Sequence, residues 1–195
     1  MKKIYIASTN PGKIKEYKEA LKDVLIESII DLRFDLTIEE TGNTFKENSF
    51  IKAQKLYEKV KSPVLADDSG LIVNALIGEL GVKSKRFSKS ETDADNMNLL
   101  LEKLKNEKDR SAYFETVICL YLNPKEIYYF SGKTKGKILI EKRGISGFGY
   151  DPLFLPEGKN KTYAEMNIYE KQAISHRGKA IKKLIEAINN ETVNL

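Results

Sequence analysis

The chain has 195 residues, of which 41% are hydrophobic and 31% charged, and this ordinary globular composition argues against a disordered protein. No apolar run is long enough to cross a bilayer, and the N-terminal apolar stretch reaches Ser8 too early to form a signal-peptide core. The formal net charge of +5 suits a polyanionic partner, either a nucleic acid or a phosphorylated small molecule, although dispersed surface lysine is the favoured explanation.

The single cysteine, Cys119, lies in an apolar run and cannot form an internal disulfide. A buried, inert thiol is the expected state, and it fits a reducing compartment. We therefore expect a cytoplasmic protein. Because the sequence contains no repeat, low-complexity tract or linker, we also expect a single domain over residues 1–195.

The first predicted element is a strand at residues 3–7, which a turn at 10–12 connects to a helix. A second helix begins after a capping box formed by Thr44 and Glu47. The apolar faces of these two helices consist of Ile14, Tyr17 and Leu21 in the first, and Phe45, Ala53, Leu56 and Val60 in the second.

A short strand at 63–66 then runs into the acidic sequence at 67–70, and a third helix begins near Thr92. Strands are predicted at 113–122 and 127–130, on either side of a turn. The apolar face of the third helix consists of Met97, Leu100, Leu101 and Leu104.

A further strand is predicted to end near Ile140, followed by a glycine-rich loop at 144–151 and a closing helix. The closing helix has Ile181, Leu184, Ile185 and Ile188 on one face. Helices at both ends of a strand-rich centre indicate an α/β fold with a mixed sheet.

The segment from Ser8 to Lys13 lies between a predicted strand and a helix. Free backbone N–H groups and the helix dipole form an anion site at such a position, and Lys13 adds a full positive charge. Ala7 and Ile14 replace the glycine and the Ser/Thr of a P-loop, so a standard P-loop ATPase is disfavoured. Taken alone, a plain chain reversal explains the segment equally well.

Two pairs of acidic residues, at 39–40 and 67–68, form a second candidate site. Adjacent residues on a strand point to opposite faces, so only one carboxylate of each pair can face a given site. One carboxylate from each pair would make an oxygen-rich site for Mg²⁺, which neutralises phosphate charge. An isolated Asp-Asp pair is better explained as the end of a strand.

Two later segments offer groups that could contact a nucleotide base. In the segment 146–152, Phe148 can stack on a planar base and Asp151 can accept hydrogen bonds. His176 and Arg177 stand at the start of the closing helix, where several donors converge. His176 is the only histidine, so a metal site built from several histidines is excluded. Each segment is a weak signal by itself.

Taken together and in this order, the segments resemble the inosine triphosphate pyrophosphatase family. They are Ser8-Thr9-Asn10-Pro11-Gly12-Lys13, Glu39-Glu40-Thr41-Gly42, Ala66-Asp67-Asp68-Ser69-Gly70-Leu71, Gly147-Phe148-Gly149-Tyr150-Asp151-Pro152 and Ser175-His176-Arg177-Gly178. They span nearly the whole chain, which makes chance agreement improbable. Thr9 stands where many members of the family carry glycine, a difference that leaves Asn10 and Lys13 in place.

The resemblance implies an elongated α/β protein with a long twisted mixed sheet flanked by helices and an active-site cleft between two lobes, usually a homodimer. It implies Mg²⁺-dependent hydrolysis of ITP, dITP and XTP to the monophosphate and pyrophosphate. Asp68 would be the catalytic carboxylate and a metal ligand and Glu39 the second ligand, with Asp67 and Glu40 as alternates. The implied substrate-binding residues are Ser8, Thr9, Asn10, Pro11, Gly12, Lys13, Ser69, Phe148, Gly149, Tyr150, Asp151, Lys171, His176 and Arg177.

Base selection is expected to depend on donors from His176, Arg177 or the backbone, which pair with a 6-oxo purine but not with the 6-amino group of adenine. A related pyrophosphatase for dTTP or UTP is the closest alternative. A basic nucleic-acid-binding protein is the other alternative, but it gives no reason for the carboxylates of Glu39 and Asp68. We expect neither a stable nucleic-acid complex nor a membrane partner.

Overall fold

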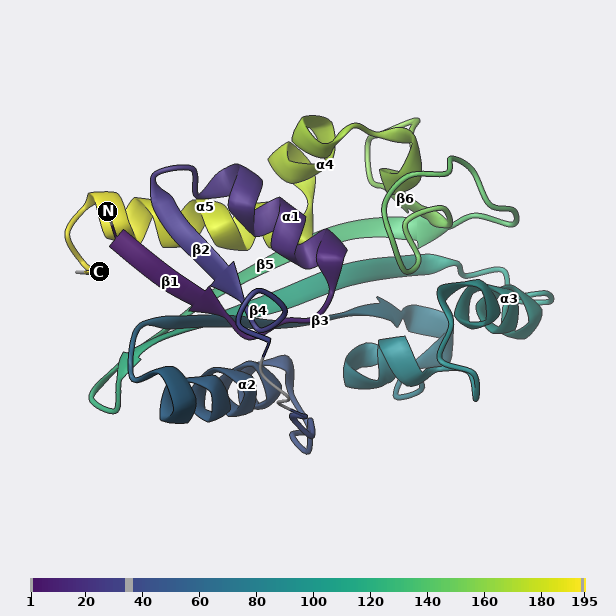
Figure 1. Ribbon diagram of the computed structural model, residues 1–195. Helices are drawn as coiled ribbons and strands as arrows, with labels where there is room; N and C mark the ends of the chain where they lie inside the picture. Colours follow the sequence, from purple (N-terminus) through teal and green to yellow (C-terminus); the bar gives the residue numbers. More distant parts are fainter. Residues whose placement is uncertain (1, 34–36, 194) are drawn as a thin grey trace. The chain divides into compact units, whose positions relative to one another are not determined.

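The computed structural model describes residues 2–33, 37–193 and 195 (Figure 1). The helices and strands in chain order are β1 (Lys2–Ile6), α1 (Pro11–Ala20), β2 (Val24–Ser28), α2 (Phe45–Val60), β3 (Val64–Val73), α3 (Asp93–Lys103), β4 (Ser111–Asn123), β5 (Glu126–Ile138), β6 (Phe154–Pro156), α4 (Ile168–Ile174) and α5 (His176–Asn189). Three short 3-10 helices are η1 (Asn74–Leu76), η2 (Gly81–Arg86) and η3 (Tyr163–Glu165). No helix in these ranges has the length and apolar character needed to span a membrane.

The strands form one six-stranded sheet in the order β2-β1-β3-β4-β5-β6. β1 pairs in parallel with both β2 and β3, whereas β5 and β6 are antiparallel. This mixed sheet with flanking helices confirms the predicted α/β class.

The chain divides into two compact units. Unit 1 comprises Met1–Asp68, Thr116–Gly132 and Lys179–Leu195, and unit 2 comprises Ser69–Glu115 and Lys133–Gly178. Strands β3, β4 and β5 and helix α5 each contribute residues to both units. The single domain expected from the sequence stays a prediction.

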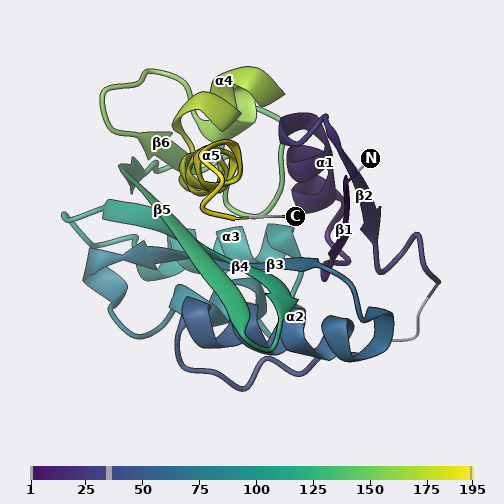
Figure 2. The same ribbon diagram turned by 90° about the vertical axis from the view of Figure 1, so that its left-hand side faces the viewer.

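In unit 1, alternate strand residues face two different helical layers. Leu65 and Ile118 pack in one buried cluster with residues of α1 and α5, whereas Ala66 and Cys119 pack in another with residues of α2. Figures 1 and 2 show α5 on one side of β4 and α2 on the other. Strands buried on both faces need continuous apolar runs, which is why the sequence here lacks a polar alternation.

The predicted starts of α2 and α3 are confirmed. The capping box of Thr44 and Glu47 is present at the start of α2, and Thr92 caps α3. The turn predicted at 10–12 is instead the start of α1: Asn10 caps this helix by accepting a hydrogen bond from the backbone N–H of Lys13, with Pro11 at the first helical position.

Two strand predictions were wrong in their length. The strand predicted at 63–66 continues to Val73, so the acidic residues at 67–68 lie inside β3 and do not follow it. Glycine at position 70 lets the longer strand pass close to η2, because a Cβ there would lie only 2.1 Å from the carbonyl oxygen of Gly81. The two strands predicted between 127 and 140 are one strand, β5.

Candidate active site

Asp67 and Asp68 are neighbours in β3, so their side chains point to opposite faces of the sheet. Asp67 Oδ2 lies 3.0 Å from Lys13 Nζ at the start of α1. Asp68 Oδ2 accepts a hydrogen bond of 3.0 Å from Asn48 Nδ2 in α2. Both carboxyl groups are buried, with only 2% and 5% of each residue exposed. One strand therefore supplies a buried carboxylate to each helical layer.

Lys52 of α2 links two of the acidic residues. Its Nζ lies 2.6 Å from Glu40 Oε1 and 3.5 Å from Asp68 Oδ1. Burial alone would lower the pKa of the Lys52 ammonium group, but the charges of Asp68 and Glu40 outweigh it and raise the pKa above its ordinary value. Lys52 is therefore charged at neutral pH and holds the two carboxylates near one another.

The Asp68 carboxyl group has an unusual titration. Burial raises its pKa above the ordinary value, although the ammonium groups of Lys52 and Lys13 act in the opposite direction. A carboxylate with a raised pKa is a stronger base than an exposed aspartate. The position is therefore suited to accepting a proton.

Thr116 of β4 fixes the backbone at this point. Its hydroxyl oxygen lies 3.1 Å from the carbonyl oxygen of Asp68 and 3.3 Å from Asp67 Oδ2. These contacts lie entirely within unit 1 and are buried. They orient both acidic residues relative to the neighbouring strand.

The segment from Ser8 to Lys13 runs from the end of β1 into the first turn of α1, which begins at Pro11 and so earlier than predicted. Ser8 Oγ accepts a hydrogen bond from the backbone N–H of Asn10, and Asn10 Oδ1 accepts one from that of Lys13, at 3.2 and 3.1 Å. Thr9 and Pro11 are exposed and Gly12 is half-buried. The first turn of a ten-residue helix, with Lys13 beside it, is a favourable place for an anion.

Glu39 and Glu40 differ in their exposure and in their ion pairs. Glu39 is exposed and forms no ion pair or side-chain hydrogen bond with any described residue, whereas Glu40 reaches Asp68 through Lys52. Within residues 2–33, 37–193 and 195, no three acidic, histidine or cysteine side chains cluster as a metal site. Mg²⁺ is commonly held by only one or two carboxylates together with water and phosphate oxygens, so Asp68 and one member of this pair suit the ion.

A second cluster of predicted residues lies in unit 2, around Asp151. Asp151 Oδ2 accepts hydrogen bonds from Lys171 Nζ at 2.6 Å and from the backbone N–H of Phe148 at 3.0 Å. The Lys171 ammonium group lies 4.6 Å from the centre of the Phe148 ring. Gly147, with a φ of +81°, permits the close approach, because a Cβ would lie 2.1 Å from Asp151 Oδ2. Phe148 and Lys171 are thereby held together.

Helix α5 begins at His176, so His176 and Arg177 occupy its first two positions, as predicted. Ser175 caps this helix by accepting a hydrogen bond of 3.0 Å from the backbone N–H of Gly178. A Cβ at Gly178 would lie 1.7 Å from the carbonyl oxygen of Gln172, so only glycine allows α4 and α5 to meet this closely.

The side chains of His176 and Arg177 are buried against aromatic rings. The His176 ring stacks on Phe114 with centroids 4.7 Å apart and planes 11° from parallel. Arg177 Nη2 donates to Ser69 Oγ at 2.9 Å, and its guanidinium carbon lies 5.7 Å from the centre of the Phe148 ring. This cluster combines cationic donors with a half-buried aromatic ring.

Two predicted residues of the glycine-rich segment have structural contacts. Tyr150 is buried in the core of unit 2, where its hydroxyl donates to the carbonyl oxygen of Ser84 at 2.7 Å and burial raises its pKa. The backbone N–H of Gly149 donates to Asp93 Oδ2 at 2.6 Å. These contacts anchor the segment that carries Phe148.

Sequence reasoning missed Asn48, Lys52 and Thr116. Asn48 and Lys52 were detectable, because with Leu56 they repeat every four residues along the buried stripe of α2. Polar residues in an apolar stripe need buried partners. For Thr116, a single hydroxyl at a buried position of β4, the sequence holds no such signal.

Comparison with known proteins finds similarity over nearly the whole chain. Residues 4–187 match the Ham1 family. The chain is 43% identical to the dITP/XTP pyrophosphatase of Aquifex aeolicus, over 96% of this chain and 97% of that protein. It is 44% identical to the dITP/XTP pyrophosphatase of Flavobacterium johnsoniae, over 95% and 97%. The solved structure of a HAM1 protein from Coxiella burnetii is also similar, with a TM-score of 0.88 and 40% identity over 97% of this chain and 100% of that chain.

Proposed function

The chain belongs to the Ham1 family, and we propose that it is a magnesium-dependent pyrophosphatase that hydrolyses ITP, dITP and XTP to the monophosphate and pyrophosphate. The observation that carries this proposal is the buried Asp68 carboxylate, which is oriented by Asn48 and paired with Lys52. The names of the relatives support the reaction and the substrate class.

In this proposal, the start of α1 binds the triphosphate. Lys13 and the backbone N–H groups of the first helical turn contribute positive charge, and the residues from Ser8 to Gly12 shape the turn. In the described structure Lys13 pairs with Asp67, so its ammonium group is already fixed near β3. Substrate phosphates would share this charge.

Asp68 accepts the proton of the water molecule that attacks the α-phosphorus, and pyrophosphate leaves with the electron pair of the broken P–O bond. Asp68 and Glu39, with Glu40 as the alternate, are the proposed ligands of Mg²⁺. When bound, the ion neutralises charge on the phosphate oxygens. Lys52 keeps Asp68 and Glu40 in place and adds positive charge beside the reacting group.

The cluster of unit 2 is proposed to bind the base and the sugar. Phe148 offers a ring for stacking, while Arg177 and His176 supply donors for the 6-oxo group of the purine. Asp151 and Lys171 hold Phe148, and Ser69 orients Arg177. ATP would leave these donors opposite an amino group, which costs about 1–3 kcal/mol for each unpaired group.

Product analysis tests the reaction. Purified protein with ITP and Mg²⁺ should release IMP and pyrophosphate in equal amounts, with no added pyrophosphatase. Release of IDP and orthophosphate would overturn the proposed bond cleavage. Parallel assays with XTP, dTTP and UTP separate this proposal from the pyrimidine alternative, which predicts faster turnover of dTTP or UTP.

A cytoplasmic location and a homodimeric state complete the proposal. The buried single thiol, Cys119, suits a reducing compartment. Light scattering on the purified protein tests the dimer, and a monomer mass at micromolar concentration would contradict it.

A further inference from the structure

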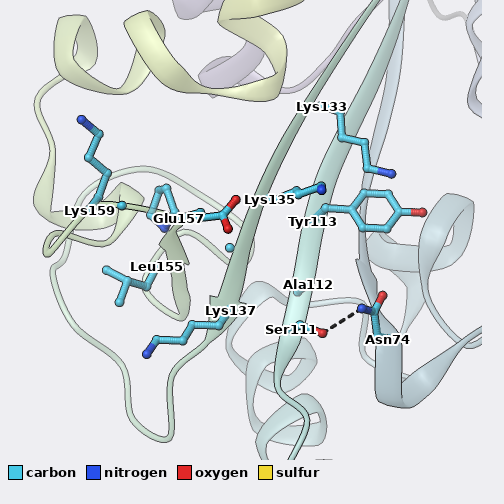
Figure 3. Close-up of a pocket in the computed structure, with 13 residues that line it drawn as sticks. Asn74, Ser111, Ala112, Tyr113, Lys133, Lys135, Lys137, Leu155, Glu157 and Lys159 are labelled. Atoms are coloured by element: carbon cyan, nitrogen blue, oxygen red, sulfur yellow. Dashed lines mark hydrogen bonds between the residues drawn. The ribbon is translucent and has the colours of Figure 1, made fainter.

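A pocket of about 600 Å³ opens on unit 2, between β4, β5 and the turn that follows β6 (Figure 3). Its charged lining consists of Lys133, Lys135, Lys137, Lys159 and a single acidic residue, Glu157. Four ammonium groups against one carboxylate give the pocket a formal net charge of +3. A concave surface with charges of one sign concentrates the field and attracts anions.

Strand alternation gathers three of these lysines in a row. Lys133, Lys135 and Lys137 are exposed on one face of β5, while Thr134 and Ile138 on the other face are buried. Alternate residues of a strand lie roughly 6.6 Å apart, so the row spans about 13 Å. This length suits several phosphate groups or one whole nucleotide.

The pocket faces away from the proposed base-binding cluster. Phe114 of β4 points into the core of unit 2 and stacks on His176. Its neighbour Tyr113 points to the opposite face, where it lines the pocket and the centre of its ring lies 3.2 Å from Lys133 Nζ. A ligand here would therefore leave the cluster around His176 accessible.

A tight turn supplies the third wall. The backbone N–H of Lys159 donates to the carbonyl oxygen of Pro156 at 3.1 Å, and Gly158 adopts a φ of +71° between them. The backbone N–H of Glu157 donates to the carbonyl oxygen of Lys135 at 3.0 Å, so the turn is tied to the lysine row. Lys159 lines the pocket on the side opposite Tyr113, with its side chain directed outward (Figure 3).

Three of the lysines lack protein counterions. Lys135, Lys137 and Lys159 are exposed, and none of them forms an ion pair with any residue that the structure describes. Like charges at such spacing repel one another, and a multivalent anion relieves the repulsion. Lysine binds phosphate as a point charge, which fits this arrangement.

We propose that this pocket is a second nucleotide site, which binds a nucleoside di- or triphosphate without hydrolysing it. The volume is within the range of small-molecule sites and far exceeds what inorganic phosphate needs. The lysine row contacts the phosphates, while Tyr113 and the hydrogen-bonded pair of Asn74 and Ser111 contact the nucleoside.

The chain has no tryptophan, so a single Tyr113→Trp substitution gives a fluorescence reporter inside the pocket. Titration with ATP in EDTA should produce a saturable change in emission. Adding Lys135→Gln and Lys137→Gln to this variant should weaken binding at least tenfold. Lys105→Gln with Lys108→Gln, an exposed pair elsewhere in unit 2, should leave the affinity unchanged. A Tyr169→Trp reporter on exposed α4 should show no saturable change.

Equilibrium dialysis provides a readout that does not need the reporter. The wild-type chain should bind one more ATP than the Lys135→Gln, Lys137→Gln variant, whether or not the protein hydrolyses ITP. If the Lys105→Gln, Lys108→Gln pair weakened ATP binding as much as the Lys135→Gln, Lys137→Gln pair, only net charge would matter. This result would overturn the proposal. So would tighter, steeply salt-dependent binding of an oligothymidylate, or a changed oligomeric state of the pocket variant in light scattering.

Discussion

Asp68 carries a charge that burial disfavours, and this combination is typical of a residue retained for chemistry. Asp68→Asn keeps the shape of the side chain but removes its charge and its ability to accept a proton. We expect kcat for ITP to fall by about 10²–10⁴-fold. Because the folded-state pKa is raised, ionised Asp68 destabilises the folded protein above its unfolded pKa. The variant loses this cost but also leaves the buried Lys52 with one counterion fewer, so a thermal melt serves here only as the control that it is folded.

Asp67→Asn is the matched control, because Asp67 is the adjacent buried carboxylate and pairs with Lys13. It should lower kcat less than Asp68→Asn. Near-wild-type turnover by Asp68→Asn at saturating Mg²⁺ would reject the assignment, and a larger loss in Asp67→Asn would transfer the role to Asp67.

Substitutions of Glu39 and Glu40 distinguish a role in metal binding from a role in the ion pair with Lys52. Glu40 is 2.6 Å from Lys52, whereas Glu39 is exposed. Glu39→Gln should raise the Mg²⁺ concentration for half-maximal activity at least about tenfold, with kcat recovered at saturation. Glu40→Gln should lower kcat with a smaller change in that concentration. Magnesium titrations that give the reverse pattern would assign the metal to Glu40.

Substitution of Arg177 tests whether this residue selects the base. Arg177→Ala should lower kcat/KM for ITP by about 10–100-fold and for the slow ATP reaction much less, because a charged donor to the 6-oxo group is lost. Arg143→Ala, which removes a half-buried arginine paired with Glu165, is the control. Equal losses for ITP and ATP would instead indicate that Arg177 binds phosphate.

At the scale of elements, helix ends were predicted better than strand lengths. Caps such as Thr44 and Thr92 act through local hydrogen bonds, so the sequence nearby contains the signal. The prediction for β3 stopped at Ala66 because aspartate, serine and glycine are uncommon in strands. The strand continues because Asp67 and Asp68 find buried partners on α1 and α2, which are distant in sequence.

The turn after β2 supports a pH prediction. Asp31 accepts hydrogen bonds from the backbone N–H and hydroxyl of Ser28 and lies 3.2 Å from Lys18 of α1. The Ser28 hydrogen bonds, with a smaller effect of Lys18, lower the pKa of Asp31 to about 2. A lowered folded-state pKa stabilises the protein above the unfolded value, and this stabilisation is lost as pH falls through about 2.

Asp31→Asn should therefore lower Tm at pH 6, and the difference from wild type should shrink between pH 4 and about pH 2. Asp23→Asn, an exposed substitution just before β2, is the control and should change Tm little at any pH. If the Tm difference between wild type and Asp31→Asn stayed constant across this pH range, the ionised carboxylate would not be the source of the stabilisation.

At the scale of the whole molecule, the order of the five segments indicated the function, but only the folded chain shows which residues meet. Glu40, and not Glu39, contacts Lys52, because helix α2 presents that lysine toward β3. Tyr150, which the resemblance placed among the substrate contacts, lies in the core with its hydroxyl bonded to Ser84. Such outcomes depend on side-chain direction, which a sequence alone does not specify.

The single cysteine allows the stability of the folded chain to be measured directly. Cys119 is fully buried in β4 among residues of α2, and burial raises its pKa to about 12. A neutral, enclosed thiol reacts only when the protein opens. With a stability of roughly 5–15 kcal/mol, native labelling by a disulfide reagent should be at least about 10³-fold slower than labelling in urea. The slope of labelling free energy against urea should equal the m-value from circular dichroism. Fast labelling in native buffer that does not depend on urea would instead reveal local opening of α2 over β4.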